Sequence, residues 1–475
     1  MTRAAAALVA FAAMAAACGS DGEADTAAPT SAGGATATTA AGAAAAGGED
    51  PASWGVKDKK VIGPAGYTID LSKCPSNWSD TEGVTATEIR LVQTFPFSGN
   101  NAISGNISNA IKAYFEHVNA TEGGIGGKKI AFTVKDDGYE AARSKANVDE
   151  LVETVKPLAF MPLSGTPGTL AVYDKLHDMC VPNLMNGTGH QLGADPVNHP
   201  WSTGSYLSYP SEAAIWAEYL AKTIPGGTVA GLFVNSDFGA SYRIAFEKEA
   251  VKRGLKIAKI ELFDQAAATI TNEMTTLAST NADALVLGTF GVFCSQSMKA
   301  LSELSWKPKV KIIDNPCSGP AFFKPAGDAG KDFVTAQYRK DGGDVSFAND
   351  PDVKAAQAIL SKAGLDEKDS YTNWGAWWAL PLVDIMKKAN ARPGGISRTN
   401  LMLAAWSAQY KHPLNRGGIK FEMNGLKDAY FTEGAVLTRY AIEPGEEVGR
   451  QVEFGDVIEQ NGTGALCAWD GKACK

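Results

Sequence analysis

The chain has 475 residues, of which 44 are Lys or Arg and 52 are Asp or Glu, so its formal net charge is -8. An acidic chain without a visible basic patch argues against nucleic acid as a partner, because binding a phosphate backbone needs clustered cations. The length allows two lobes once the terminal segments are set aside.

The amino-terminal residues have the pattern of a bacterial lipoprotein signal peptide. Arg3 precedes a small, apolar stretch over residues 4–17, and residues 15–19, Ala-Ala-Ala-Cys-Gly, resemble a lipobox in which Cys18 receives the lipid. Residues 19–52 are mostly Ala, Thr and Gly, too poor in large apolar groups to offset the entropy of ordering, and we interpret them as a disordered tether. No later stretch approaches the ~18 apolar residues that span a bilayer. We therefore expect the protein on the outer face of the cytoplasmic membrane, held by its lipid anchor alone.

The first regular elements follow an arm, which we predict over residues 53–83 because this stretch has few periodic apolar positions. Residues 89–95 favour a strand, and residues 107–118 carry apolar side chains at helical spacings of three and four. Residues 130–134 alternate in polarity as a second strand does. A crossover of helix length between two strands predicts that they are parallel neighbours in one sheet.

This unit recurs along the chain in two series, over residues 89–203 and 211–314. Ser211 is the expected cap of the helix that opens the second series, and the last third is less regular. Further helices are predicted at 141–155, 170–178, 211–220, 240–253, 274–279, 295–304, 353–362, 374–388 and 398–408, and further strands at 158–163, 181–185, 228–234, 255–263, 284–287, 310–313, 419–421 and 435–442.

The two series predict an α/β protein with two doubly wound lobes, a ligand cleft between them and a hinge of several chain crossings. We place the first lobe at residues 84–207 and about 334–430, the second at about 208–333 and 431–458, and a tail at 459–475. Small, hydroxyl-bearing loops end several of the strands. Such strand ends are where open α/β sheets bind ligands.

Seven cysteines leave six after Cys18 is assigned to a lipid, and six allow ~15 pairings. Cys294 and Cys317 each follow an apolar strand of the same predicted sheet, which places both at one rim. Cys467 and Cys474 are candidates to close a small loop, which would leave Cys74 and Cys180. An oxidising compartment favours disulfides. Metal ligation is the alternative, but no Cys-x-x-Cys or paired His accompanies these residues, so we predict no metal.

The order of landmarks resembles the leucine/isoleucine/valine-type solute-binding proteins of ABC transporters, which have the type I periplasmic-binding-protein fold. The resemblance covers roughly residues 84–455. It rests on residues 95–99 (Phe-Pro-Phe-Ser-Gly), 123–128 (Gly-Gly-Ile-Gly-Gly-Lys), 136–137 (Asp-Asp), 162–166 (Pro-Leu-Ser-Gly-Thr), 182–188 and 237–239 (Asp-Phe-Gly). It implies a protein without a cofactor that captures a small solute by lobe closure and delivers it to a permease and an ATPase.

The resemblance also implies which residues contact the solute. In the family, two loops at strand ends bind the ligand carboxylate, and aromatic side chains of the second lobe pack on it. A helix N-terminus suits an anion because it presents unpaired N–H donors and a partial positive charge. The positions of this chain that match are Ser164, Gly165, Thr166, Asn186, Gly187, Thr188, Phe238 and Asn315. Phe290 is similarly placed at the rim of the second lobe, and Asp237 is a nearby acid, so both are candidate ligand-binding residues as well.

Asn315 marks a departure from amino-acid-binding relatives, in which an acid near this position pairs with the ligand ammonium. Asp314 or Asp237 is a candidate to replace it. A buried ammonium without a carboxylate is costly. We therefore expect a ligand that lacks an α-amino group, such as an amide, urea or a carboxylic acid.

Two other classes of function are an enzyme and a ligand sensor. An enzyme is not predicted, because the sequence has no Gly-x-Ser-x-Gly and no His-Glu-x-x-His, and its five histidines are scattered. A ligand-sensing lipoprotein that signals through a membrane partner would have the same fold and cleft, so this alternative stays open.

Overall fold

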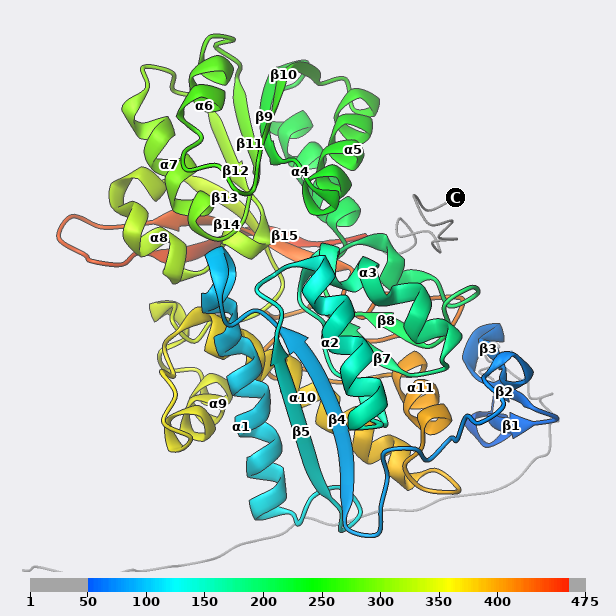
Figure 1. Ribbon diagram of the computed structural model, residues 1–475. Coiled ribbons are helices and arrows are strands. Elements are labelled where there is room, and N and C mark those ends of the chain that lie inside the picture. The colour runs from blue at the N-terminus through cyan, green and yellow to red at the C-terminus, as the bar shows by residue number, and fades with distance from the viewer. Residues whose placement is uncertain (1–49, 461–475) are drawn as a thin grey trace, which may run out of the picture. The chain divides into compact units, whose positions relative to one another are not determined.

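The structure is a computed structural model that describes residues 50–460. Two large sheets organise this part of the chain (Figure 1). In the first sheet the strand order is β5-β4-β6-β7-β8 and every neighbouring pair is parallel. Its apolar central strands are buried on both faces, as in a sheet covered by helices on two sides. The strands are β4 (Glu88–Phe95), β5 (Lys129–Asp136), β6 (Ala159–Phe160), β7 (Asn183–Asn186) and β8 (Ser202–Gly204).

The second sheet repeats this plan and extends it. Its order is β10-β9-β11-β12-β13-β14-β15, parallel from β10 to β13 and antiparallel at its last two pairings. The first five strands thus have the same winding as the first sheet. They are β9 (Thr228–Val234), β10 (Lys256–Phe263), β11 (Ala284–Gly288), β12 (Val310–Ile313) and β13 (Phe333–Gln337), followed by β14 (Gly434–Ala441) and β15 (Arg450–Glu459).

Helices cover both faces of each sheet (Figure 1). On the first sheet, α1 (Gly105–Thr121) and α10 (Ser370–Ala391) pack together on one face, and α2 (Ala141–Thr154) and α3 (Gly165–Asp178) pack together on the other. On the second sheet, α4 (Tyr209–Thr223) and α5 (Asp237–Lys252) lie on one side. The other side carries α6 (Thr271–Ala278) and α7 (Val292–Glu303), and the remaining helices are α8 (Pro320–Ala326), α9 (Pro351–Lys362) and α11 (Arg398–Trp406).

Within the described residues, the chain passes three times between the elements of the two sheets: after β8, after β13 and before β14. Short 3-10 helices occupy several of the connections. They are η1 (Pro51–Ser53), η2 (Pro64–Gly66), η3 (Leu71–Lys73), η4 (Gly99–Ser104), η5 (Gln191–Ala194), η6 (Asn315–Cys317), η7 (Gly327–Gly330) and η8 (Val345–Phe347). Several crossings favour a hinge over a free swing of two parts.

The amino-terminal arm contains a small antiparallel sheet of β1 (Gly55–Lys57), β2 (Lys60–Ile62) and β3 (Thr68–Asp70). The buried hydroxyl of Tyr67 donates to the Pro200 carbonyl at 2.8 Å. A disulfide between Cys74 and Cys180 also joins the arm to the end of α3. The arm is therefore fixed to the first lobe both covalently and by burial.

The second disulfide joins Cys294 and Cys317, the pair that the sequence places at one rim. Cys18, Cys467 and Cys474 lie outside the described residues. Among residues 50–460, no group of three or more His, Cys, Asp or Glu side chains is arranged to hold a metal. None of the helices described there has the length and apolar character that a membrane crossing requires.

Two local predictions were wrong. The helix α4 is capped by Ser208, whose hydroxyl accepts the Ser211 N–H at 3.1 Å, so Ser211 lies inside the first turn. Pro210 next to the cap fits this earlier start, because proline is well accommodated in the first turn. Residues 419–421 form no strand, and their neighbourhood contributes only isolated bridges such as Gln409 to Glu422.

Candidate ligand-binding site

A cavity of about 70 Å³ lies where the carboxyl ends of strands from both sheets come together. The first lobe contributes the loops that follow β4 to β7, and the second contributes residues that follow β9, β11 and β12. Helix α10 closes the side of the cavity. The lining residues are Phe95, Asn101, Ser104, Ile107, Tyr139, Ser164, Gly165, Gly187, Tyr206, Tyr209, Phe238, Phe290, Gly291, Pro316, Tyr371, Trp374 and Trp378.

Aromatic rings form most of this wall. Tyr206 stacks on Trp378, with centroids 5.5 Å apart and planes 8° apart, and on Trp374 at 5.2 Å and 30°. From the other lobe, Phe290 packs on Tyr139 at 5.6 Å and Phe238 meets Tyr209 edge-on at 5.0 Å. Such contacts fix the ring planes and make the wall of the cavity predominantly aromatic.

The loop after β6 supplies the polar end of the cavity. Ser164 precedes α3, but its side chain makes no capping hydrogen bond to that helix. Gly165 has a φ of 68°, and a Cβ there would lie 2.3 Å from the Tyr139 ring. At Gly187 a Cβ would lie 2.5 Å from the Leu163 carbonyl oxygen and 2.8 Å from Trp378. Both glycines therefore allow the loops to approach the aromatic wall.

Three predicted residues lie behind this wall. The buried hydroxyls of Thr166 and Thr188 are 2.7 Å apart and connect the two loops. Asn186 is also buried, and its Nδ2 donates to Ser202 Oγ at 3.0 Å. These side chains contact the loops that face the cavity and do not line the cavity themselves.

Asp237 and Asn315 do not line the cavity either. Asp237 is exposed at the start of α5. The side-chain amide of Asn315 donates to the Ala336 carbonyl at 2.7 Å, and its neighbour Pro316 lines the cavity instead. Asp314 is fully buried, and its carboxyl oxygens accept the backbone N–H groups of Thr289 at 2.6 Å and Cys317 at 3.2 Å.

The structure thus brings together Ser164, Gly165, Gly187, Phe238 and Phe290 of the predicted set. Sequence reasoning missed the remaining rings, above all those of α10. The lining residues include no Asp, Glu, Lys, Arg or His. A solute in this cavity would meet aromatic faces, a few hydroxyl and amide groups and no opposite charge in direct contact.

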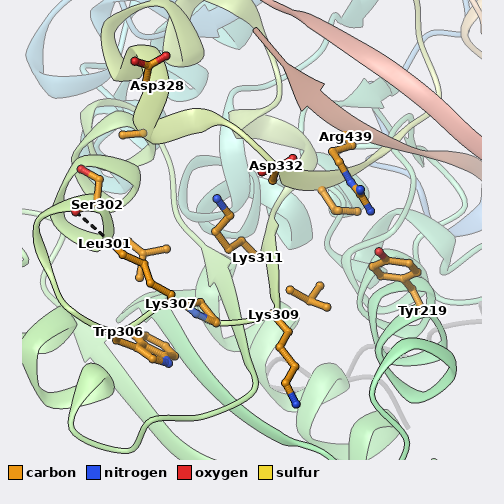
Figure 2. Close-up of a pocket in the computed structure, with 14 residues that line it drawn as sticks. Tyr219, Leu301, Ser302, Trp306, Lys307, Lys309, Lys311, Asp328, Asp332 and Arg439 are labelled. Atoms are coloured by element: carbon orange, nitrogen blue, oxygen red, sulfur yellow. Dashed lines mark hydrogen bonds between the residues drawn. The ribbon is translucent and has the colours of Figure 1, made fainter. Parts of the chain in front are cut away.

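A larger cavity of about 500 Å³ lies at the amino ends of β12 and β13, the edge of the second sheet away from these loops (Figure 2). Lysine side chains that line this cavity are already paired with other groups of the protein. Lys309 pairs with Asp283 at 2.9 Å, and Lys307 donates to the Ser302 and Leu304 carbonyls at the end of α7. Such contacts complete a helix end and a sheet edge.

A family model for periplasmic binding proteins matches residues 88–430. The chain belongs to this family. No curated protein sequence matches the chain. The matched segment contains every loop that lines the aromatic cavity, so this periplasmic binding protein carries its cavity within the region that defines the family.

Solved structures of similar fold agree with the type I arrangement of this periplasmic binding protein. A branched-chain amino acid ABC transporter protein from Thermus thermophilus with bound valine is 18% identical, has a TM-score of 0.70 and is covered over 97% of its length by 79% of this chain. A fatty acid ABC transporter substrate-binding protein from Thermomonospora curvata is 20% identical and has a TM-score of 0.69, and the match covers 81% of this chain and 96% of that protein. A solute-binding protein from R. palustris in complex with 4-hydroxybenzoate is 18% identical and has a TM-score of 0.66, and the match covers 79% of this chain and 98% of that protein.

Proposed function

We propose that the protein is an extracytoplasmic lipoprotein that captures a small carboxylate without an α-ammonium group, preferably an aromatic one, and delivers it to an ABC importer. The single observation that carries the choice of solute is the cavity wall, in which nine aromatic rings and no charged side chain occur. The lipid anchor at Cys18 and the permease and ATPase partners belong to the same proposal.

The absence of a contacting acid argues against leucine, isoleucine or valine. A buried ammonium needs a carboxylate or several acceptors to offset its lost hydration. Asp314 already accepts two backbone N–H groups away from the cavity, and Asp237 is exposed to solvent. Neither carboxyl group is placed to contact a solute in the cavity.

The polar end of the cavity suits a carboxylate. Ser164 stands at the amino end of the 14-residue helix α3, where the helix dipole favours negative charge. Its hydroxyl is not used by the helix and is available to donate to the solute. We propose that Ser164 contacts the carboxylate, that Thr166, Asn186 and Thr188 position the two loops, and that Phe238 and Phe290 close over the ring.

Thermal unfolding of the full-length chain tests the solute class. We expect benzoate and 4-hydroxybenzoate to raise the melting temperature, since a ligand at ~100 times its dissociation constant stabilises the folded state by about 2.7 kcal/mol. Benzylamine, leucine, isoleucine and valine should leave it unchanged. A shift with the three amino acids and none with the benzoates would refute this proposal.

Ser164→Ala tests the proposed contact between the Ser164 hydroxyl and the carboxylate of the solute. Removing one hydroxyl donor should weaken benzoate binding by at least about tenfold, because a hydrogen bond to a charged group contributes about 1.5–3 kcal/mol. Thr166→Ser is the matched control, since it keeps a hydroxyl in the same loop behind the wall. Isothermal titration calorimetry on both variants gives the comparison. Equal affinities for Ser164→Ala and the unaltered protein would remove Ser164 from the site.

A further inference from the structure

A buried guanidinium lies directly behind the aromatic wall. Arg339 belongs to the segment that leaves β13 for the helices of the first lobe, and only 2% of its surface is exposed. Its guanidinium carbon lies 4.3 Å from the ring centroid of Trp374, whose indole lines the cavity. A positive charge therefore stands one ring away from the space where the solute binds.

Arg339 has a carboxylate partner nearby but makes no short hydrogen bond to it. Arg339 Nη1 is 3.6 Å from Asp341 Oδ2, longer than a charge-assisted hydrogen bond of about 2.7–2.9 Å. Arg339 Nε and Nη1 and Asp341 Oδ2 have no hydrogen-bond partner among the described residues. The other oxygen of Asp341 accepts the Gly343 N–H at 2.9 Å. Buried charged groups left this way are costly and call for a functional explanation.

The positive charge of Arg339 acts on side chains that line the cavity. Burial raises the pKa of the Tyr206 and Tyr371 hydroxyls, and the positive charge of Arg339 acts against that rise at both. Both tyrosines line the cavity, as does Trp374. Three cavity-lining rings thus lie within the field of one guanidinium, while the lining itself has no formal charge.

We propose that Arg339 is a specificity-determining residue that makes this cavity prefer an anionic solute over its neutral isostere. It acts through the wall formed by Trp374 and does not contact the solute. In a region of low effective dielectric, a unit charge several ångströms away still favours an anion. Asp341 opposes this preference, because its carboxylate pairs with that guanidinium at 3.6 Å. This inference rests on the proposed function and names what selects the charge of its solute.

Benzoate and benzamide are the probes, since they share size and shape and differ in charge. Titration calorimetry on the full-length chain should show a preference of about tenfold for benzoate in the unaltered protein. Arg339→Met should reduce this preference while retaining benzamide binding, and the part that remains is due to Ser164 and the amino end of α3. Arg339→Lys keeps a positive charge and should keep part of the preference. Asp341→Asn removes the opposing charge and should increase it.

Asp341→Asn separates a charge effect from a structural one, because a general loosening of the wall cannot increase the ratio of benzoate to benzamide affinity. A ratio of benzoate to benzamide affinity that is unchanged in Arg339→Met, or that falls in Asp341→Asn, would overturn the role of Arg339 while leaving the proposed function standing. An equal loss of affinity for benzoate and benzamide in Arg339→Met would also overturn the role of Arg339. Failure of both ligands to bind the unaltered protein would overturn the proposed solute class and this inference together.

Discussion

Tyr206→Ala should weaken benzoate binding at least about 30-fold, the loss expected when an aromatic residue at the centre of a binding site contributes roughly 2 kcal/mol. Tyr206 is the ring that stacks on both Trp374 and Trp378, so its removal takes away a cavity face and the contact that holds two other faces in place. The residue lies on the crossing that follows β8, between the two lobes.

Tyr206→Phe is the control, since it keeps the stacked ring and removes only the hydroxyl. We expect it to bind benzoate nearly as well as the unaltered protein. Titration calorimetry measures both affinities, and the melting temperature without ligand shows whether each variant is folded. A folded Tyr206→Ala protein with unchanged affinity would show that the solute binds elsewhere.

Sequence reasoning predicted the loops of this candidate site and two of its rings, Phe238 and Phe290, and missed the other rings. Ser164 and Gly187 were found because they end parallel strands, and parallel strands deliver their carboxyl ends to one edge. Trp374 and Trp378 follow about 200 residues later on α10 and were interpreted only as part of a helix. Their spacing of four places both on one helical face. That face was the available signal, but nothing local shows that it closes a cleft formed by loops of another segment.

The fold shows the same division between local and distant information. Central strands such as β9 are continuous apolar stretches and were predicted, because both of their faces are buried. The edge strand β15 was missed, since it alternates charged and apolar residues and pairs along only one side. Strand β8 is the three-residue sequence Ser-Thr-Gly, whose composition does not favour a strand. Tertiary pairing, and not propensity, determines these edges.

The role of Asn315 likewise depended on a distant partner. Its backbone N–H donates at 2.8 Å to Glu212 Oε1, and Glu212 Oε2 accepts from the Tyr242 hydroxyl at 2.6 Å. Glu212 comes from α4, about 100 residues earlier in the chain. A neutral residue at position 315 therefore coincides with a buried carboxyl group behind it, which no alignment of local motifs reveals.

Glu212 should make the free energy of unfolding fall as the pH rises from about 4.5 to about 8. Burial raises the pKa of its carboxyl group to about 8, although the Tyr242 and Asn315 hydrogen bonds act in the opposite direction. Asp314 is buried nearby, and burial followed by repulsion from Glu212 raises its pKa as well. Between the unfolded and folded pKa values, the folded protein retains a proton that the unfolded chain releases. Stability is then fully present below the unfolded pKa and is lost as the pH rises through the folded pKa.

The expected loss is several kcal/mol, at about 1.4 kcal/mol for each unit of pKa difference. Urea denaturation at pH 5, 6.5 and 8 measures it. Burial lowers the pKa of His412 to about 3 and of His190 to about 4, and these groups contribute the opposite slope below about pH 6.5. The comparison with Glu212→Gln isolates the carboxyl group, because glutamine keeps an oxygen for the Asn315 N–H and cannot ionise.

Glu212→Gln should therefore show a smaller loss of stability with rising pH and should exceed the unaltered protein in stability at pH 8. Glu218→Gln is the matched control, since Glu218 lies on the same helix and pairs with Lys222 at the surface. Because surface pairs contribute at most about 1 kcal/mol, this control should keep the pH dependence of the unaltered protein. Parallel pH profiles for Glu212→Gln and the unaltered protein would show that Glu212 is ionised in the folded state. The Asn315 N–H and the Tyr242 hydroxyl would then donate to a carboxylate, and the charge behind the second-lobe edge of the cavity would be negative at neutral pH.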